Sequence, residues 1–483
     1  MSESIRDHVF SGVKWNLVGK LGHYGMQFIV SIILARLLLP AEFGLIGMLA
    51  IFMAIAQVFI NSGMSSALIQ KKDTTGEDYS TVFYYNLMIA FIFYALLFFT
   101  SGYIAAFFDQ PELTQLTKYM AMVFLINAAG TVQATILKKE LRFKKINVIK
   151  IIGVIISGVV AVFMAYNDFG VYAIVGQAVS FALVTNALYW LNSNWKPAFV
   201  FSKQSFINLF GFGAKLLISS LLDQVYKNLS TLIIGKAFSA AQLGYFTRAK
   251  SSRDLPIQNT SGVLTNIVFP VFAKEKNDET LKRHHLKFLS LVAYVTFPVM
   301  VGMAIVAEPF IVILFTDKWL PSVPMLQILC IGGPTYPLSV ILVSTLLAKG
   351  KSGLFLKLDI YKKSVGLAAM VLGLLFGFYP FLLGVTAASL IGLILNFYYV
   401  GKTIHTKAGE YANALMPGLM LSLAMGAIVF GTGYLLPENH YIQLTVQATL
   451  GIFIYAGASY MLKLDDFEYL KNLLREKLQR KKT

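Results

Sequence analysis

Long apolar segments and short polar segments alternate along the chain from one end to the other. Most apolar segments hold about twenty residues or more, and a helix of that length, rising about 1.5 Å per residue, crosses a hydrocarbon core of roughly 30 Å. Transmembrane β-strands would instead alternate with a period of two, and runs such as Leu87–Phe99 do not. The pattern therefore predicts an all-α membrane protein, a bundle of transmembrane helices.

The polar segments divide the chain into fourteen expected spans. These are Val13–Leu39, Phe43–Leu68, Thr81–Phe108, Leu116–Leu137, Ile146–Tyr166, Gly170–Leu191, Phe212–Phe238, Gly244–Phe272, Leu286–Ala307, Val323–Leu347, Leu358–Tyr379, Phe381–Val400, Ala412–Leu436 and Ile442–Leu462. An even number of spans puts the two termini on the same side of the membrane.

Composition and charge agree with this prediction. Of the 483 residues, 57% are hydrophobic and 13% are charged, and the mean hydropathy is +0.66. The net charge of +17 collects in alternate connecting segments, such as Lys138–Lys150, Lys274–Lys287 and Lys349–Lys363. If the N-terminus is cytoplasmic, all of these segments are cytoplasmic, which is the positive-inside distribution. The charge therefore indicates a multi-pass topology with both termini in the cytoplasm, and no nucleic-acid partner.

Two further features limit the chemistry. The N-terminal segment has no short apolar core followed by a small-residue cleavage site, so we expect no cleaved signal peptide. Cys330 is the only cysteine and lies among apolar residues, so the sequence offers no disulfide and no metal cluster. We also expect no cofactor beyond a possible coupling proton or sodium ion.

The eighth expected span, Gly244–Phe272, is unusually polar. It contains Arg248, Lys250, Arg253 and Asp254, and also Pro256, which would be a functional kink or a tolerated one. If this segment did not cross the membrane, every basic segment after it would change sides. Charged residues at membrane depth are tolerated when they face a water-filled cavity or protein, so we expect this helix to line a wet cavity.

Four expected spans carry polar residues on one helical face, because the spacings follow steps of three and four. The stripes are Asn16, Lys20, His23, Gln27 and Ser31 in the first span; Gln57, Asn61 and Ser65 in the second; Lys215, Ser219, Asp223, Lys227 and Ser230 in the seventh; and Thr247, Ser251, Asp254, Gln258, Ser261 and Thr265 in the eighth. Interhelical hydrogen bonds are the structural alternative for the neutral residues, and the pairs Asp223–Lys227 and Lys250–Asp254 could neutralise each other. A net cationic surplus remains.

The polar stripes return after six spans, and so does a turn. Ala41–Gly44 joins spans one and two, and Ala241–Gly244 joins spans seven and eight. Repeated halves with a site between them are a recurrent transporter design. We therefore expect two pseudo-symmetric six-helix lobes, residues 1–203 and 204–405, followed by two further helices in residues 406–463 and a cytoplasmic tail in residues 464–483.

Five segments in order resemble bacterial polysaccharide flippases, in particular the WzxC-like branch that exports colanic acid and lipopolysaccharide. These segments are Ala35–Met48, Gly63–Asn86, Leu243–Pro256, Asn266–Asp278 and Ala307–Gly333. The family belongs to the multidrug, oligosaccharidyl-lipid and polysaccharide (MOP) exporter superfamily. The resemblance implies a two-lobed transporter of the bacterial inner membrane, not an enzyme.

The resemblance also implies a substrate: an oligosaccharide on undecaprenyl diphosphate, moved from the cytoplasmic to the periplasmic leaflet. Membrane lipids and other polysaccharide-assembly proteins are the further partners it implies. The related lipid II flippases place cations on the first and eighth helices of their cavity, and the similar positions here are Lys14, Lys20, Arg248 and Arg253.

A diphosphate needs cations, and sugars need amides and hydroxyls. The predicted diphosphate site is Lys14, Lys20, Lys215, Lys227, Arg248 and Arg253, and the predicted sugar contacts are Gln27, Asn61, Gln258 and Asn259. His23, Asp223 and Asp254 are candidates for a coupling proton or sodium ion, each with a salt bridge or hydrogen bond as the structural alternative. Arg36, at the outer end of the first span, is expected to snorkel to the interface.

Other functions remain open at this point. A drug or cation antiporter, or a lipid II flippase, would share the fold, but the cationic surplus favours an anionic cargo. A polytopic glycan polymerase or glycosyltransferase is the more remote alternative, since the outer loops are short and the six histidines are scattered.

The C-terminal tail is predicted to be amphipathic. Leu464, Phe467, Leu470, Leu474 and Leu478 repeat at helical spacing and basic residues follow. We expect this helix to lie on the anionic inner leaflet, with a specific partner site as the alternative.

Overall fold

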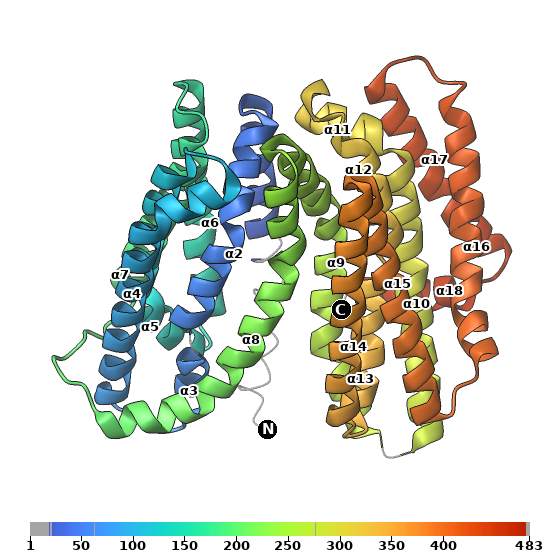
Figure 1. The fold of residues 1–483 in the computed structure, drawn as a ribbon. Coiled ribbons are helices and arrows are strands. Elements are labelled where there is room, and N and C mark those ends of the chain that lie inside the picture. The colour runs from blue at the N-terminus through green and yellow to red at the C-terminus, as the bar shows by residue number, and fades with distance from the viewer. Residues whose placement is uncertain (1–18, 20–21, 62, 276, 480–483) are drawn as a thin grey trace. The chain divides into compact units, whose positions relative to one another are not determined.

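The structure is a computed structural model that describes residues 19, 22–61, 63–275 and 277–479 (Figure 1). These residues form helices, turns and loops, and no strand occurs among them. The chain divides into two compact units, residues 1–244 and 245–483. An all-helical fold is confirmed for the part of the chain that the structure describes.

The first unit follows the predicted spans closely. Its helices are residues 22–37, α2 (Pro40–Asn61), α3 (Met64–Gln70), α4 (Gly76–Phe108), α5 (Leu113–Lys139), α6 (Phe143–Tyr166), α7 (Tyr172–Leu191) and α8 (Lys203–Ala237). The second predicted span is two helices, because Gly63 lies between α2 and α3 with φ of 66°, a left-handed conformation that ends a helix.

Polar contacts fix the ends of α3, α4 and α5. Thr75 caps α4: its Oγ1 accepts from the Asp78 N–H at 3.2 Å, while Asp78 Oδ2 accepts from the Thr75 N–H at 2.9 Å. The same carboxylate pairs with Lys71 Nζ at 2.6 Å and is fully buried. Lys139 Nζ donates to the carbonyls of Leu68 at 3.0 Å and Lys71 at 2.6 Å, so three helix ends are tied together.

Small residues let the helices of the first unit approach closely. The helix of residues 22–37 packs Val30 and Leu34 on Ala161 and neighbouring residues of α6. A Cβ at Gly158 would meet the Val30 side chain, and one at Gly153 would meet Thr185 of α7. Close packing of small residues is how helices associate where no hydrophobic force drives them together.

The repeated turn of the sequence appears as two matching helix starts. Glu42 Oε2 accepts from the Leu39 N–H at 2.6 Å at the start of α2, and Gln242 Oε1 accepts from the Ser239 N–H at 3.2 Å at the start of α9. Each side chain satisfies a backbone donor that has no partner inside the helix. The correspondence between Ala41–Gly44 and Ala241–Gly244 is therefore also structural.

These two helix starts contact each other through their glycines. A Cβ at Gly44 would collide with the backbone of Ala240, and a Cβ at Gly244 would collide with the backbone of Pro40. The contact is reciprocal, and each side requires a residue without a side chain. All four residues belong to the first unit.

The boundary between the two units falls inside α9 (Ala240–Lys274), whose residues 240–244 belong to the first unit. The second unit contains the rest of α9, followed by α10 (Asp278–Ile305), α11 (Ala307–Phe315), η1 (Asp317–Trp319), α12 (Ser322–Gly332), α13 (Thr335–Ala348), α14 (Ser352–Phe376), α15 (Phe378–Ile404), α16 (Ala408–Gly433), α17 (His440–Met461) and α18 (Asp465–Gln479). The polar eighth span is one 35-residue helix that continues through Pro256 and Pro270. The tenth predicted span is divided between α12 and α13 at Gly333 and Pro334.

Ten segments of the described chain are long and apolar enough to cross a membrane. The predicted spans outside these ten correspond to the helix of residues 22–37, α8, α9 and α14. α8 and α9 have 35 residues each, which is ample length, but they are rich in polar side chains. The protein is a multi-pass membrane protein, and the count of fourteen stays a prediction.

The predicted lobe boundary at residue 203 also stays a prediction. Compactness groups α8 with the first unit, because α8 packs against α2, α3 and α4. The division at residue 203 is based on the repeat in the sequence, whereas the division at residue 244 is based on contacts between helices.

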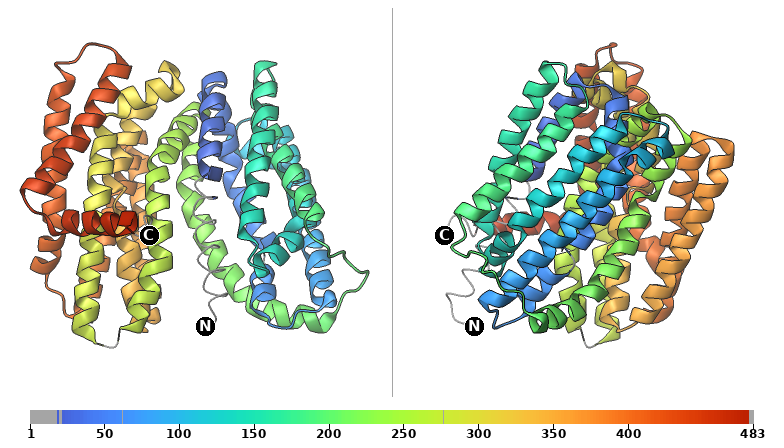
Figure 2. Two further views of the ribbon diagram at one scale, coloured as in Figure 1. Left: turned by 180° about the vertical axis from the view of Figure 1, so that it is seen from behind. Right: turned by 60° about the vertical axis from the view of Figure 1, so that its left-hand side comes forward.

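The predicted tail helix is α18, and it contacts protein along its described apolar face. Leu464, Phe467 and Leu470 pack against a cluster that includes Tyr294 and Tyr455. Asp466 accepts from Lys287 Nζ at 2.7 Å and from Ser290 Oγ of α10. Figure 2 shows α18 lying across the long helices of its unit. Leu474 and Leu478 lie outside the described side chains, and the inner-leaflet position stays a prediction.

The reciprocal glycine contact predicts a difference between two helix glycines. Gly44→Ala places a methyl group against the Ala240 backbone and is expected to destabilise the protein by about 1–3 kcal/mol. Gly102→Ala on α4 meets no atom within 4 Å, and is expected to be neutral or to stabilise by up to about 1 kcal/mol. Thermal melting of both purified variants in detergent measures the difference. Equal melting temperatures would contradict the contact.

Candidate functional site

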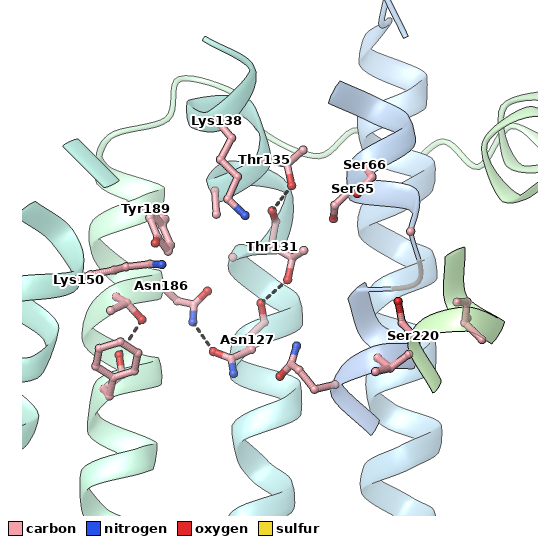
Figure 3. Close-up of a pocket in the computed structure, with 18 of the residues that line it drawn as sticks. Ser65, Ser66, Asn127, Thr131, Thr135, Lys138, Lys150, Asn186, Tyr189 and Ser220 are labelled. Atoms are coloured by element: carbon pink, nitrogen blue, oxygen red, sulfur yellow. Dashed lines mark hydrogen bonds between the residues drawn. The ribbon is translucent and has the colours of Figure 1, made fainter. Parts of the chain in front are cut away.

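The first unit contains a cavity of about 670 Å³ (Figure 3). Residues of α2, α3, α5, α6, α7 and α8 line it. The lining residues are Gln57, Val58, Gly63, Ser65, Ser66, Asn127, Gly130, Thr131, Ala134, Thr135, Lys138, Lys150, Phe181, Thr185, Asn186, Tyr189, Leu217, Ser220 and Gln224. Its volume lies in the usual range for small-molecule sites, and most of its side chains are polar.

The charge of the lining is entirely positive. Lys138 comes from the last turn of α5 and Lys150 from α6, and no aspartate or glutamate occurs among the residues that line the cavity. In Figure 3 both lysines lie on the side of Tyr189, whereas Ser65, Ser66 and Ser220 lie on the other side. The cavity therefore has a cationic side and a neutral side.

An amide pair crosses from α5 to α7. Asn186 Nδ2 donates to Asn127 Oδ1 at 3.3 Å and to the Ala182 carbonyl at 2.7 Å. Gly130 makes room for this pair, because a Cβ there would collide with the Asn186 amide. Trp190 Nε1 donates to the Ala129 carbonyl at 2.8 Å, which holds the same two helices together. The amides are thus fixed in place by their helices.

Three threonines of the lining bond back to their own helices. Thr131 donates to the Asn127 carbonyl at 2.8 Å, Thr135 to the Thr131 carbonyl at 2.8 Å, and Thr185 to the Phe181 carbonyl at 2.7 Å. A hydroxyl whose proton is used in this way retains lone pairs that accept hydrogen bonds. The cavity therefore offers acceptors from threonines and donors from lysines and amides, and it suits a polar ligand with hydroxyl groups and negative charge.

A metal site finds no support in the described part of the chain. No group of three or more His, Cys, Asp or Glu side chains is placed there to hold an ion. Cys330 is buried in the second unit.

Two predicted site residues, Lys14 and Lys20, lie outside the described residues. For Lys215, Asn61 and Asn259 only the helical backbone is described, in α8, α2 and α9. Their predicted roles stay predictions.

The predicted residues of the first unit fall in different surroundings. Gln27, Asp223 and Lys227 are exposed. His23 is half-buried, with ring centroids 5.5 Å from Tyr24 and 6.1 Å from Phe181, a cavity residue. From the polar stripe of the second span, Gln57 and Ser65 line the cavity.

The predicted residues of the second unit lie on α9. Arg248 is only 5% exposed and its guanidinium carbon stands 4.8 Å from the Phe315 ring centroid and 5.1 Å from that of Trp319. Arg253 Nη2 pairs with Asp254 Oδ1 at 2.6 Å, and the charge of the same carboxylate also acts on Lys250, the partner that the sequence suggested. Gln258 is exposed.

Most residues of the cavity are not predicted by the sequence as site residues. Membrane topology is the only role that the sequence predicts for Lys138 and Lys150, and it predicts none for Asn127, Asn186 and the threonines of α5. The available signal was the series Asn127, Thr131, Thr135 and Lys138, whose spacing of 4, 4 and 3 marks one face of a helix.

Comparisons with known proteins agree on one family. A model of the family described as "Polysaccharide biosynthesis protein" matches residues 33–324, more than half of the chain. The chain is 29% identical to the teichuronic acid biosynthesis protein TuaB of Bacillus subtilis (strain 168) over 467 residues, which cover 94% of each chain. It is 26% identical to the lipopolysaccharide biosynthesis protein WzxC of Escherichia coli (strain K12) over 440 residues, 89% of each chain.

The fold has a solved counterpart. The structure of the lipid II flippase MurJ in an inward closed conformation matches with a TM-score of 0.74 at 16% identity, covering 92% of this chain and 98% of that chain. At this identity the similarity concerns the fold. Together with the sequence matches, it confirms the resemblance to polysaccharide flippases.

The amide pair and Gly130 predict a non-additive pair of substitutions. Gly130→Ala is expected to displace Asn186 and to lower stability by about 1–3 kcal/mol. In an Asn186→Ala background the added methyl group has space, so the same change should cost clearly less. Thermal melting of the two single variants and the double variant measures the interaction between the two positions. Strictly additive shifts of the melting temperature would show that Gly130 is not needed to accommodate the Asn186 amide.

Proposed function

The chain belongs to the polysaccharide biosynthesis protein family, and on that premise we propose that it is a flippase for a lipid-linked oligosaccharide. The substrate is a repeat unit of lipopolysaccharide, capsule or exopolysaccharide on undecaprenyl diphosphate. The protein moves this unit from the cytoplasmic to the periplasmic leaflet of the bacterial inner membrane, and both termini lie in the cytoplasm.

The observation that carries the proposal is the lining of the cavity. It combines two lysines, amides and hydroxyls with no carboxylate among its residues. Such a lining suits a sugar with negative charge, and it is unfavourable for the cationic cargo of a drug antiporter, which would need carboxylates for charge compensation.

The repeat in the sequence supports a transport cycle by alternating access. Two six-helix lobes, residues 1–203 and 204–405, alternate between access to the cytoplasm and to the periplasm. Residues 406–463 add two membrane helices and residues 464–483 the cytoplasmic tail. The prenyl chain stays in lipid, because its burial there costs nothing, while the polar head group crosses between the lobes. His23, Asp223 and Asp254 are the candidates for a coupling proton or sodium ion.

The diphosphate is bound by cations of the first, seventh and eighth spans in this proposal. Lys14, Lys20, Lys215, Lys227, Arg248 and Arg253 supply the charge, and Gln27, Asn61, Gln258 and Asn259 hydrogen-bond to sugars. What supports this assignment is the cationic surplus of the polar stripes and the similar positions in related lipid II flippases.

Glycan export by cells tests the proposal. In a strain that lacks the chromosomal gene, the double variant Lys20→Ala, Arg248→Ala is expected to export at least about tenfold less glycan than the wild type, since each lost charged hydrogen bond contributes about 1.5–3 kcal/mol. The measurement is surface glycan normalised to membrane protein level. Lys145→Ala, on the exposed side of α6, is the control and should export normally.

The variant Arg248→Lys keeps the positive charge at this position but loses the planar guanidinium that packs against Phe315 and Trp319. It therefore distinguishes the contribution of the charge to export from that of the packing. Full export by the Lys20→Ala, Arg248→Ala double variant would overturn the diphosphate assignment. Unchanged glycan export in the deletion strain itself would overturn the flippase proposal.

A further inference from the structure

We propose that the cavity of the first unit binds the glycan of the transported molecule and that Lys138 and Lys150 select an acidic sugar. This inference rests on the flippase function proposed above and specifies the substrate class. It assigns the cavity to the sugar end of the substrate and leaves the diphosphate to other cations.

The composition of the lining favours a sugar over a diphosphate. Diphosphate groups are typically held by several convergent charged donors, with arginine providing bidentate contacts. The lining has no arginine, and its neutral polar side chains far outnumber its two lysines. Hydroxyls and amides in this excess match the many hydroxyl groups of an oligosaccharide.

The hydrogen-bonding groups are positioned before a ligand arrives. The hydrogen bond from the Asn186 amide to the Asn127 amide joins α7 and α5, and the Thr131 and Thr135 hydroxyls donate to helix carbonyls. Threonine oxygens then accept from sugar hydroxyls, while amide and ammonium groups donate to them. Preorganised groups of this kind lose little entropy on binding.

The two lysines make one side of the cavity positively charged. They enter from different helices, α5 and α6, and lie on the Tyr189 side of the cavity (Figure 3). A lysine ammonium is a compact, strongly hydrated charge, and a ligand that displaces its water must compensate with an anion. A neutral sugar would compensate poorly, whereas a sugar carboxylate or phosphate at this side would compensate well. The sugar ring then extends toward Ser65, Ser66 and Ser220.

The cavity also sets the size of the recognised group. A volume of about 670 Å³ fits a short oligosaccharide of a few sugar units and cannot enclose a finished polymer. Recognition of one acidic repeat unit is therefore the function that the volume supports.

Binding by purified, full-length protein in detergent tests the inference with three probes: trigalacturonic acid, maltotriose and farnesyl diphosphate. The wild type should bind trigalacturonic acid at least about tenfold more tightly than maltotriose. The double variant Lys138→Gln, Lys150→Gln should bind trigalacturonic acid at least about tenfold more weakly than the wild type. The double variant Lys138→Arg, Lys150→Arg keeps both charges and should bind this probe nearly as tightly as the wild type. Lys145→Gln is the matched control, because it removes the same charge from α6 outside the cavity.

The third probe distinguishes the source of the anion. Farnesyl diphosphate carries the diphosphate without sugars, and its affinity should not change in Lys138→Gln, Lys150→Gln. A selective loss of farnesyl diphosphate binding in that variant would overturn the inference, as would equal affinity of the wild type for maltotriose and trigalacturonic acid.

The glycan-export assay keeps this inference separate from the proposed function. Normal export together with absent selectivity for the acidic probe overturns only the acidic-sugar assignment. Lysine-dependent selectivity in a protein whose deletion leaves export intact overturns only the transport proposal.

Discussion

In a hydrocarbon solvent, a polar side chain must face protein, water or the head-group region, and this constraint decides where every element of the structure directs its residues. α4 shows the result on a single helix. Phe99 and Tyr103 are 78% and 80% exposed, whereas Asn86 and Ser101 are buried against neighbouring helices. The distribution is inverted relative to a water-soluble protein, and the polar cavity of the first unit is the same constraint acting on several helices at once.

The helices could be predicted because this constraint leaves a signal in each segment separately. Even the polar α9 was predicted as a helix, from the alternation of basic segments, and the structure has one continuous helix of 35 residues there. Its crossing of the membrane stays a prediction. The interruptions at Gly63 and at Gly333–Pro334 were not predicted. They depend on local backbone conformation within apolar sequence, which hydropathy does not register.

The cavity was harder to predict because it belongs to no single segment. A stripe on one helix shows which face is polar, but not which other faces meet it. Gln57 and Ser65 belonged to a recognised stripe and do line the cavity, yet Lys138 and Lys150 had a sufficient explanation in the positive-inside rule. One residue can satisfy a topological and a binding requirement together, and charge statistics reveal only the first.

The reciprocal contact of Gly44 with Ala240 and of Gly244 with Pro40 has the form of an isologous interface, in which the same patch occurs on both sides. In a homodimer every substitution in such a patch would occur twice. Within one chain the two copies are free to diverge where side chains project, as Glu42 and Gln242 do. They must still keep glycine where backbone touches backbone, so the chain combines a symmetric backbone contact with chemically different side chains around it.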